Sequence, residues 1–271
     1  MDSIIVIRGG GDLASGIALR LFRAGYRFLI TEIPEPLSVR RTVSFSEAIY
    51  LGLIKIEGVA GRKVTSIDEI NRYITDEIPV IVDEDMEFIK KNFSKISVLI
   101  DARMEKKSAK QKVYRDFPFV IGIGPGFVAG KDCNVVIETN RGHSLGRIYR
   151  KGRTELDTGI PAGNPNRVLR AINNGIIQNQ CKIGYIVEKD QIIARIGKDE
   201  IRAPFTGLIR GLLHDGLQVR TGLKIGDLDH RLDNSLCQLV SEKSLAIGGS
   251  VLEVILSDTS QLPLIRRSPE K

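Results

Sequence analysis

The chain has 271 residues, 42% of them hydrophobic, and a formal net charge of +7 at pH 7. That length suffices for one large domain or two modest ones, and the composition is that of a soluble globular protein. No run of 18 apolar residues and no signal-peptide pattern is present, so the sequence predicts no membrane partner and a cytoplasmic location.

Composition also disfavours two kinds of site. Aromatic residues make up only 6% of the chain and no nucleic-acid module is recognisable, so we expect no nucleic-acid partner. The three cysteines, Cys133, Cys181 and Cys237, are too widely spaced for a disulfide framework or a C-x-x-C metal site, and we expect no bound metal. The positive charge leaves open an anionic ligand, an anionic partner or simply a soluble surface.

The first thirty residues predict a strand, a glycine turn, a helix and a second strand. An apolar run over 4–7 precedes the turn, a helix is expected over 13–24, and the second strand ends at Glu32. The turn matches G-x-G-x-x-G/A, in which glycines let backbone N–H groups approach a pyrophosphate and the acid binds a ribose hydroxyl. The candidate cofactor-binding residues of this stretch are Gly9, Gly10, Gly11, Asp12, Leu13, Ala14 and Glu32. A glycine-rich turn that binds no dinucleotide is the alternative.

Arginines follow shortly after the second strand. Arg40 and Arg41 can each pair with phosphate or carboxylate, or can form surface ion pairs. Ser44, with Glu47 three residues later, forms a capping-box pattern that predicts a short helix over 45–51.

Apolar strands then alternate with short helices as far as residue 138, which predicts a parallel α/β sheet. A helix or loop is expected over 106–114. Ligands bind such sheets outside the carboxyl ends of the strands, and polar clusters fall on several predicted strand ends. They add Asp101, Arg103, Gly124 and Arg141 as candidate cofactor-binding residues, and His143 as a candidate catalytic acid or base. The acids at 83–85 are expected to favour a helix dipole rather than hold a metal.

The pattern changes near residue 160 to short β-type runs broken by glycine. Residues 184–196 can be laid on residues 216–228 as two β-hairpin-like copies around an A-P-x-x-G strand. This arrangement resembles the biotinyl/lipoyl-type barrel-sandwich module. The lysine of the 197–200 turn lacks the flanking pattern of an attachment site, so we expect no biotin or lipoate.

A last helix is expected over 241–256, with Gly248-Gly249 in its middle implying close approach to another backbone or a ligand. The predicted organisation is a Rossmann-like nucleotide-binding domain over 1–160, a barrel-sandwich β module over 161–234, and over 235–271 a helix that returns to the first domain, then a mobile tail.

Several blocks together resemble the YqeB family, the accessory protein of selenium-dependent molybdenum hydroxylase systems. They are the 8–16 glycine turn, T-E-I at 31–33, R-R-T-V-S-F-S-E-A at 40–48, D-A-R-M at 101–104, G-I-G-P-G-F at 122–127, E-T-N-R-G-H at 138–143, L-G-R at 145–147 and A-I-G-G at 246–249. The resemblance implies maturation of a molybdenum hydroxylase at its molybdopterin cofactor. By analogy of fold, the first domain is similar to XdhC-type factors that handle this cofactor before insertion.

Three functions follow as hypotheses. The first is a maturation factor that binds NAD or a molybdopterin nucleotide and whose partners are the hydroxylase or its cofactor-assembly proteins, with homo-oligomers possible. The second is an NAD-dependent oxidoreductase of small molecules, for which only His143 qualifies as the catalytic group by position. The third is a non-catalytic scaffold with a vestigial glycine loop.

Overall fold

The computed structural model describes residues 4–104, 117–157, 159 and 163–258. The chain divides into two compact units. The first unit is made of Met1–Pro36, Ser44–Thr158 and Val240–Lys271, and the second of Leu37–Val43 and Gly159–Leu239. The predicted segment 106–114 and the predicted tail from residue 263 onward lie outside the described residues. None of the helices in the described part of the chain is long and apolar enough to cross a membrane.

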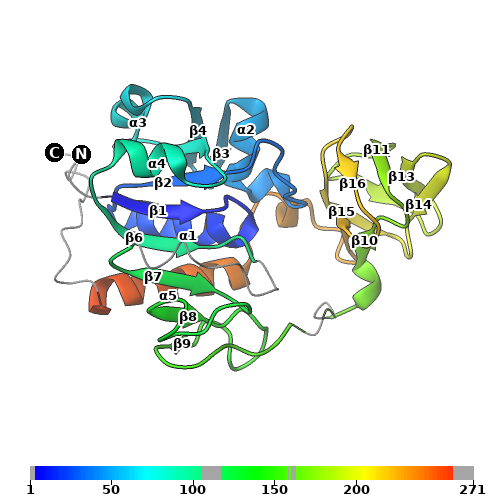
Figure 1. The fold of residues 1–271 in the computed structure, drawn as a ribbon. Helices are drawn as coiled ribbons and strands as arrows, with labels where there is room; N and C mark the ends of the chain where they lie inside the picture. The colour runs from blue at the N-terminus through cyan, green and yellow to red at the C-terminus, as the bar shows by residue number, and fades with distance from the viewer. Residues whose placement is uncertain (1–3, 105–116, 158, 160–162, 259–271) are drawn as a thin grey trace. The chain divides into compact units, whose positions relative to one another are not determined.

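The first unit is built on a nine-stranded sheet (Figure 1). Its strands follow the spatial order β3-β4-β5-β2-β1-β6-β7-β8-β9. Their bounds are β1 Ile4–Arg8, β2 Phe28–Glu32, β3 Leu53–Ile56, β4 Val59–Val64, β5 Ile78–Val82, β6 Ile96–Asp101, β7 Val120–Ile123, β8 Val135–Ile137 and β9 Ile148–Tyr149. The helices of this unit are α1 Asp12–Arg23, α2 Ala48–Leu51, α3 Ile67–Tyr73, α4 Glu87–Asn92 and α5 Glu242–Asp258, with a 3-10 turn η2 at Phe45–Glu47.

The predicted Rossmann-like parallel domain is wrong, because this sheet is mixed. In this spatial order the seven strands from β4 through β1 to β8 pair in parallel. At the two edges, β3 pairs antiparallel with β4 and β9 pairs antiparallel with β8. The β3–β4 connection is only Glu57-Gly58, both at positive φ, which is a hairpin turn. A parallel pair needs a crossover of about a dozen residues, so a two-residue connection forces the antiparallel arrangement.

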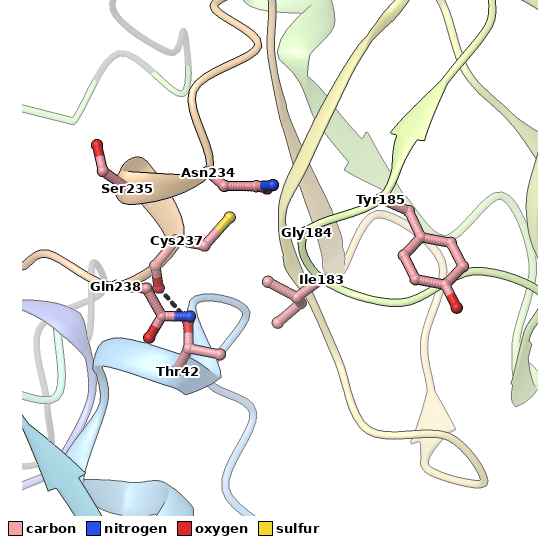
Figure 2. A pocket seen from close by; sticks show the side chains of 8 residues that line it. All are labelled: Thr42, Ile183, Gly184, Tyr185, Asn234, Ser235, Cys237 and Gln238. Atoms are coloured by element: carbon pink, nitrogen blue, oxygen red, sulfur yellow. Dashed lines mark hydrogen bonds between the residues drawn. The ribbon is translucent and has the colours of Figure 1, made fainter.

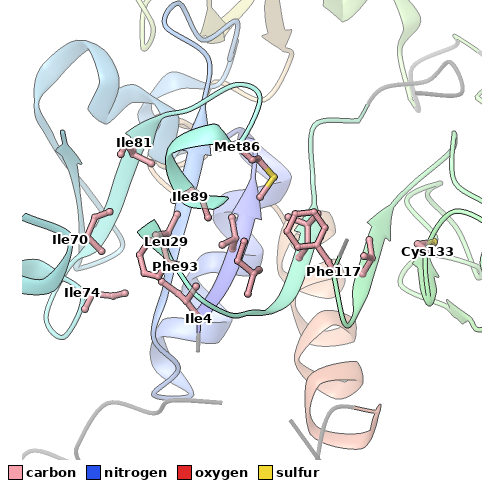
Figure 3. Packing of buried hydrophobic residues seen from close by; sticks show 14 of the residues in the cluster. Ile4, Leu29, Ile70, Ile74, Ile81, Met86, Ile89, Phe93, Phe117 and Cys133 are labelled. Atoms are coloured by element: carbon pink, nitrogen blue, oxygen red, sulfur yellow. The ribbon is translucent and has the colours of Figure 1, made fainter. Parts of the chain in front are cut away.

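The strands alternate their side chains between two covered faces. Ile4 and Val6 belong to a buried cluster with Ile70 of α3 and Ile89 of α4 (Figure 3). The intervening residues of β1 point to the opposite face, the side of α1 (Figure 1), and are also buried. Both faces of β1 are therefore covered, and its one polar residue, Arg8, stands at its end.

Helix α5 packs closely on α1 through small residues. A Cβ on Gly16 would lie 2.3 Å from the carbonyl oxygen of Ser244, and one on Gly248 would lie 2.5 Å from the carbonyl oxygen of Gly16. The Oγ of Ser244 donates to the Asp12 carboxylate at 2.9 Å. The close backbone approach predicted from Gly248-Gly249 is confirmed at Gly248, whereas Gly249 has nothing within 4 Å of its Cβ position.

The second unit consists of two four-stranded sheets with antiparallel pairing. One sheet has the order β10-β17-β15-β12 and the other β14-β13-β11-β16. The strands are β10 Val168–Arg170, β11 Gly175–Asn179, β12 Ile186–Val187, β13 Ile192–Ile196, β14 Asp199–Arg202, β15 Gly207–Leu212, β16 Gln218–Val219 and β17 Lys224–Asp229, with 3-10 turns η1 Arg41–Val43, η4 Pro165–Arg167 and η5 Asn234–Cys237.

The predicted barrel-sandwich module built from two β-hairpin-like copies is also wrong. The first copy contains β12 and β13, and the second contains β16 and β17, but in each copy the two strands lie in different sheets. Each copy therefore leads from one sheet to the other instead of closing a hairpin. The repeat matched turn glycines and apolar strand positions, and such a pattern does not specify which strands pair.

Candidate functional site

The polar side chains of the first unit gather where its central strands end. Strand β1 leads through α1 to β2 on one side, while β6 lies on the other side of β1. In open α/β sheets the crevice at such a reversal of strand order is where ligands bind. A cavity of about 60 Å³ opens there, which we call the strand-end pocket. Its lining comes from the ends of β1, β2, β5 and β6 and consists of Arg8, Gly9, Thr31, Glu32, Ile33, Asp83, Glu84 and Arg103.

Two glycines of the turn, Gly9 and Gly10, have a local packing reason. Gly9 has a φ of +89°, and a Cβ there would lie 3.1 Å from Cγ of Arg103. A Cβ on Gly10 would lie 2.9 Å from the backbone nitrogen of Ser46, which donates to the Gly10 carbonyl at 2.9 Å. The turn is thus held between Arg103 and the 45–46 segment, so Gly9 and Gly10 would be required here with or without a ligand.

The carboxylate of Glu32 accepts hydrogen bonds from the backbone of the turn and of the residue after β2. One oxygen accepts from the N–H of Gly10 at 2.7 Å, and the other accepts from the N–H of Ile33 at 2.9 Å. Burial raises the pKa of Glu32, although these two hydrogen bonds and the charge of Arg103 act in the opposite direction. A carboxylate has about four acceptor positions, so two are left for a ligand that donates hydrogen bonds.

Beside the pocket, Asp101 holds two arginines. Asp101 is almost fully buried and accepts from Arg103 at 2.8 Å, and a guanidinium nitrogen of Arg8 lies 3.9 Å from it. Arg8 also donates to the carbonyl oxygen of Glu84 at 2.7 Å. Asp83 caps α4 by accepting from the N–H groups of Phe88 and Ile89 at 3.1 and 2.9 Å, as the dipole interpretation of the 83–85 acids predicted.

Two buried polar atoms of lining residues lack partners. The Oγ1 of Thr31 and the Nε of Arg8 have no hydrogen-bond partner among the described residues. Thr31 is 1% exposed and Arg8 is 7% exposed. An unpaired buried hydroxyl or N–H is costly and uncommon in folded proteins, so such an atom at a pocket wall points to a group that the pocket receives.

Comparison with known proteins was made for the whole chain. No family model matches it. The chain is 42% identical over 259 residues to the protein described as "Uncharacterized protein YqeB" of Escherichia coli strain K12, an alignment that covers 93% of this chain and 47% of that protein.

The alignment supports the resemblance to the YqeB family.

The chain spans about half the length of this curated relative. The similar solved structures add little to this comparison. An aspartoacylase family protein from Mesorhizobium loti is 11% identical over 84% of each chain with a TM-score of 0.26. The ectoine utilization protein EutE from Ruegeria pomeroyi is 10% identical over 83% of this chain and 87% of its own, with a TM-score of 0.25. Scores at this level carry no argument about fold or function.

Three of the residues predicted from the glycine turn and the strand ends line the strand-end pocket: Gly9, Glu32 and Arg103. Asp101 lies beside the pocket through its ion pair with Arg103. Of the remaining turn residues, Asp12 accepts from Ser244. Gly10, Leu13 and Ala14 are buried or half-buried, and Gly11 precedes the first residue of α1.

The other predicted residues do not line the pocket. Arg40 and Arg41 belong to the second unit, where Arg40 donates to the Leu236 and Leu239 carbonyls and Arg41 to that of Leu212. Within the first unit, Arg141 pairs with Glu242 of α5.

His143 and Gly124 lie on loops of the first unit. His143 is exposed, and its carbonyl accepts from Arg147 at 3.3 Å. Gly124 has a φ of +78° and leaves room for Thr139 and Met104. Neither residue therefore takes part in the pocket.

Sequence reasoning missed Arg8 and Thr31. Arg8 is the last residue of β1 and Thr31 is the last but one of β2, and both follow apolar runs that were interpreted only as core. A charged residue closing a buried strand was the available signal for Arg8. Thr31 carried none, because threonine is common in strands.

Cysteine and metal chemistry have no support in the described part of the chain. Burial raises the pKa of Cys133 to about 12, so its thiol stays protonated at neutral pH. The three cysteines are buried, and no cluster of three or more His, Cys, Asp or Glu side chains suited to a metal was found among the described residues.

Proposed function

We propose that the first unit binds a hydroxyl-bearing nucleotide ligand, NAD or a molybdopterin nucleotide, at the strand-end pocket. The observation that carries the proposal is the buried, unpartnered hydroxyl of Thr31 beside the half-buried carboxylate of Glu32. Together they offer a hydroxyl that both donates and accepts and a carboxylate with free acceptor positions. A ribose diol matches this pair, since each of its hydroxyls donates one hydrogen bond and accepts others.

The size of the pocket limits which part of the ligand enters it. A cavity of about 60 Å³ takes a few waters or the edge of a sugar, not a whole dinucleotide. The pocket also holds acids as well as arginines, so its interior does not favour a phosphate. The phosphates would instead lie outside, over the turn that precedes α1, where the positive end of the helix dipole favours an anion.

We further propose that this binding serves the maturation of a selenium-dependent molybdenum hydroxylase. This part rests on the sequence resemblance to the YqeB family, whereas the geometry of the pocket supports only the ligand.

A scaffold without a ligand is the second candidate. The observation that favours it is the Gly10 N–H, which already donates to Glu32, together with the packing reason found for Gly9 and Gly10. In this case Thr31 would simply be an unsatisfied core hydroxyl.

Thermal unfolding of the full chain with NAD, NADP, CTP and isolated molybdenum cofactor tests the proposal. A ligand at 100 times its dissociation constant adds about 2.7 kcal/mol to the free energy of unfolding. A shift with one of these ligands that is lost in Thr31→Val supports the ligand site. No shift with any of them would leave the scaffold as the better account.

A further inference from the structure

Residues 139–154 of the first unit carry positive charges only, and we call them the basic segment. They include five lysines and arginines, all exposed, and no aspartate or glutamate: Arg141, Arg147, Arg150, Lys151 and Arg153. Strand β9 lies within the basic segment and is the last strand at one edge of the nine-stranded sheet (Figure 1). A surface stretch with charges of a single sign creates a local field that attracts partners of the opposite sign.

One buried side chain holds the two ends of the basic segment together. Glu138 is 0% exposed, and its carboxylate accepts from the N–H groups of Thr139 and Asn140, where the segment begins, at 2.7 Å. It also accepts from the N–H of Glu155, directly after the segment, at 2.7 Å. The conformation of the segment is therefore fixed before a partner arrives, which reduces the ordering cost of binding.

Helix α5 engages two of the five cations. Arg141 pairs with Glu242, the first residue of the helix. Arg150 donates two hydrogen bonds of 2.8 Å to the carboxylate of Asp258, the last residue of the helix. These two arginines therefore attach the basic segment to α5.

The other three cations are not used within the unit. Arg147, Lys151 and Arg153 are exposed and form no ion pair with any residue that the structure describes. Within the same residues, the only hydrogen bond of their side chains runs from the Nε of Arg147 to the carbonyl oxygen of His143, at 3.3 Å. Their charges are therefore available to a partner.

The nearest acids along the chain have interactions of their own. They are Asp132, Glu155 and Asp157. The Asp132 carboxylate accepts from the N–H of Val128 at 3.0 Å, and that of Glu155 accepts from the side-chain amide of Asn140. None of the three forms an ion pair with the free cations of the basic segment among the described residues.

Charge distinguishes this surface from the groove of the second unit. That groove lies between η5 and the turn that precedes β12, and its volume is about 490 Å³ (Figure 2). No charged residue lines it, so its lining does not indicate what it binds. The basic segment, in contrast, specifies the charge of its partner.

We propose that the basic segment docks an acidic segment of a partner protein, whose carboxylates pair with Arg147 on one side of β9 and with Lys151 and Arg153 on the other. No strand in the described part of the chain lies on the outer side of β9, so another chain can approach it. Single-stranded nucleic acid is disfavoured, because its binding sites add exposed aromatic rings and Tyr149, the one aromatic residue of the segment, packs against the core. The proposal does not depend on the ligand of the strand-end pocket.

Fluorescence anisotropy of the full chain with labelled probes tests this docking. The probes are a peptide of alternating glutamate and threonine, the same peptide with glutamine in place of glutamate, and an oligothymidylate; vesicles of anionic lipid are tested by sedimentation. We expect the glutamate peptide to bind at low salt about tenfold more tightly than the glutamine peptide, because exposed ion pairs contribute up to about 1 kcal/mol each.

Two triple variants with the same change in net charge separate the basic segment from the general charge of the protein. Replacing Arg147, Lys151 and Arg153 by glutamine should weaken binding of the glutamate peptide about tenfold. The matched control replaces Lys55, Lys91 and Lys95, three exposed lysines elsewhere in the first unit, by glutamine and should leave binding unchanged.

Other results would overturn the proposal. Cations at a sheet edge can serve only to prevent that edge from pairing with other chains, and absence of binding by the glutamate peptide would favour this role. Equal binding of the two peptides, or equal loss in the two triple variants, would show that the basic segment recognises no acidic chain. Tighter binding of oligothymidylate or of anionic vesicles, lost in the Arg147, Lys151 and Arg153 variant, would assign the segment to nucleic acid or to a membrane surface instead.

Discussion

Replacing Thr31 by valine separates the effect of its hydroxyl on stability from its effect on ligand affinity. Valine has the same shape and suits β2, so packing is retained. The hydroxyl is 1% exposed and unpartnered among the described residues, and an unsatisfied buried polar group costs about 1–3 kcal/mol. Thr31→Val should therefore raise the free energy of unfolding of the free protein by about 1 kcal/mol, while lowering ligand affinity about tenfold.

Urea unfolding of the ligand-free protein and calorimetric titration of ligand measure the two effects. Thr154→Val is the matched control, since Thr154 is 4% exposed with an equally unpartnered Oγ1 and does not line the strand-end pocket. It should stabilise the protein to a similar extent and leave affinity unchanged. A clear loss of stability in Thr31→Val would show that this hydroxyl has a partner, and would refute the reasoning.

Three further predictions concern other groups. Burial raises the pKa of Glu32 above 4.5, so its carboxyl stays protonated to a higher pH in the native state than in the unfolded state. Its contribution to stability is therefore present below pH 4.5 and is lost as the pH rises through the native pKa. Glu32→Gln should abolish that part of the pH dependence in urea unfolding, and an unchanged profile would contradict it. Gly248→Ala should cost about 1–3 kcal/mol through collision with α1, whereas Gly249→Ala, with open space around it, should gain up to about 1 kcal/mol; equal effects in thermal unfolding would be inconsistent with the α1–α5 packing. Cys133, with a pKa of about 12, should not react with Ellman's reagent at pH 8 in the folded protein, and rapid labelling of this residue detected by mass spectrometry would contradict its burial.

Local patterns in the sequence located the first elements well. The apolar run at 4–7, the glycine turn and Glu32 predicted β1, α1 and β2, because each signal acts within a few residues. The approach of α5 to another backbone was foreshadowed by Gly248, since glycine in a helix interior needs a packing reason.

Sheet pairing could not be read in the same way. The Glu57-Gly58 turn reversed the chain and made the sheet mixed, and the strands of each repeat copy joined different sheets. Both outcomes depend on contacts between residues distant in sequence. Periodicity reports which face of a strand is buried but not which strand lies beside it.

The site was predictable only in part, for the same reason. Gly9, Glu32 and Arg103 were recognisable because they end or directly follow strands. Arg40 and Arg41 were equally plausible anion ligands by type, but within the second unit they donate to carbonyl groups that are 196 and 171 residues away in the sequence. The spacing along the chain carries no information about such partners.

Calorimetric titration of the full chain with NAD, CTP and molybdenum cofactor, for the natural protein beside Thr31→Val and Thr154→Val, tests the strand-end pocket most directly. The account predicts that at least one ligand binds the natural protein and Thr154→Val with the same affinity, and binds Thr31→Val about tenfold more weakly. Equal affinity for all three proteins, or heat from none of the titrations, would contradict the assignment of this pocket as a ligand site.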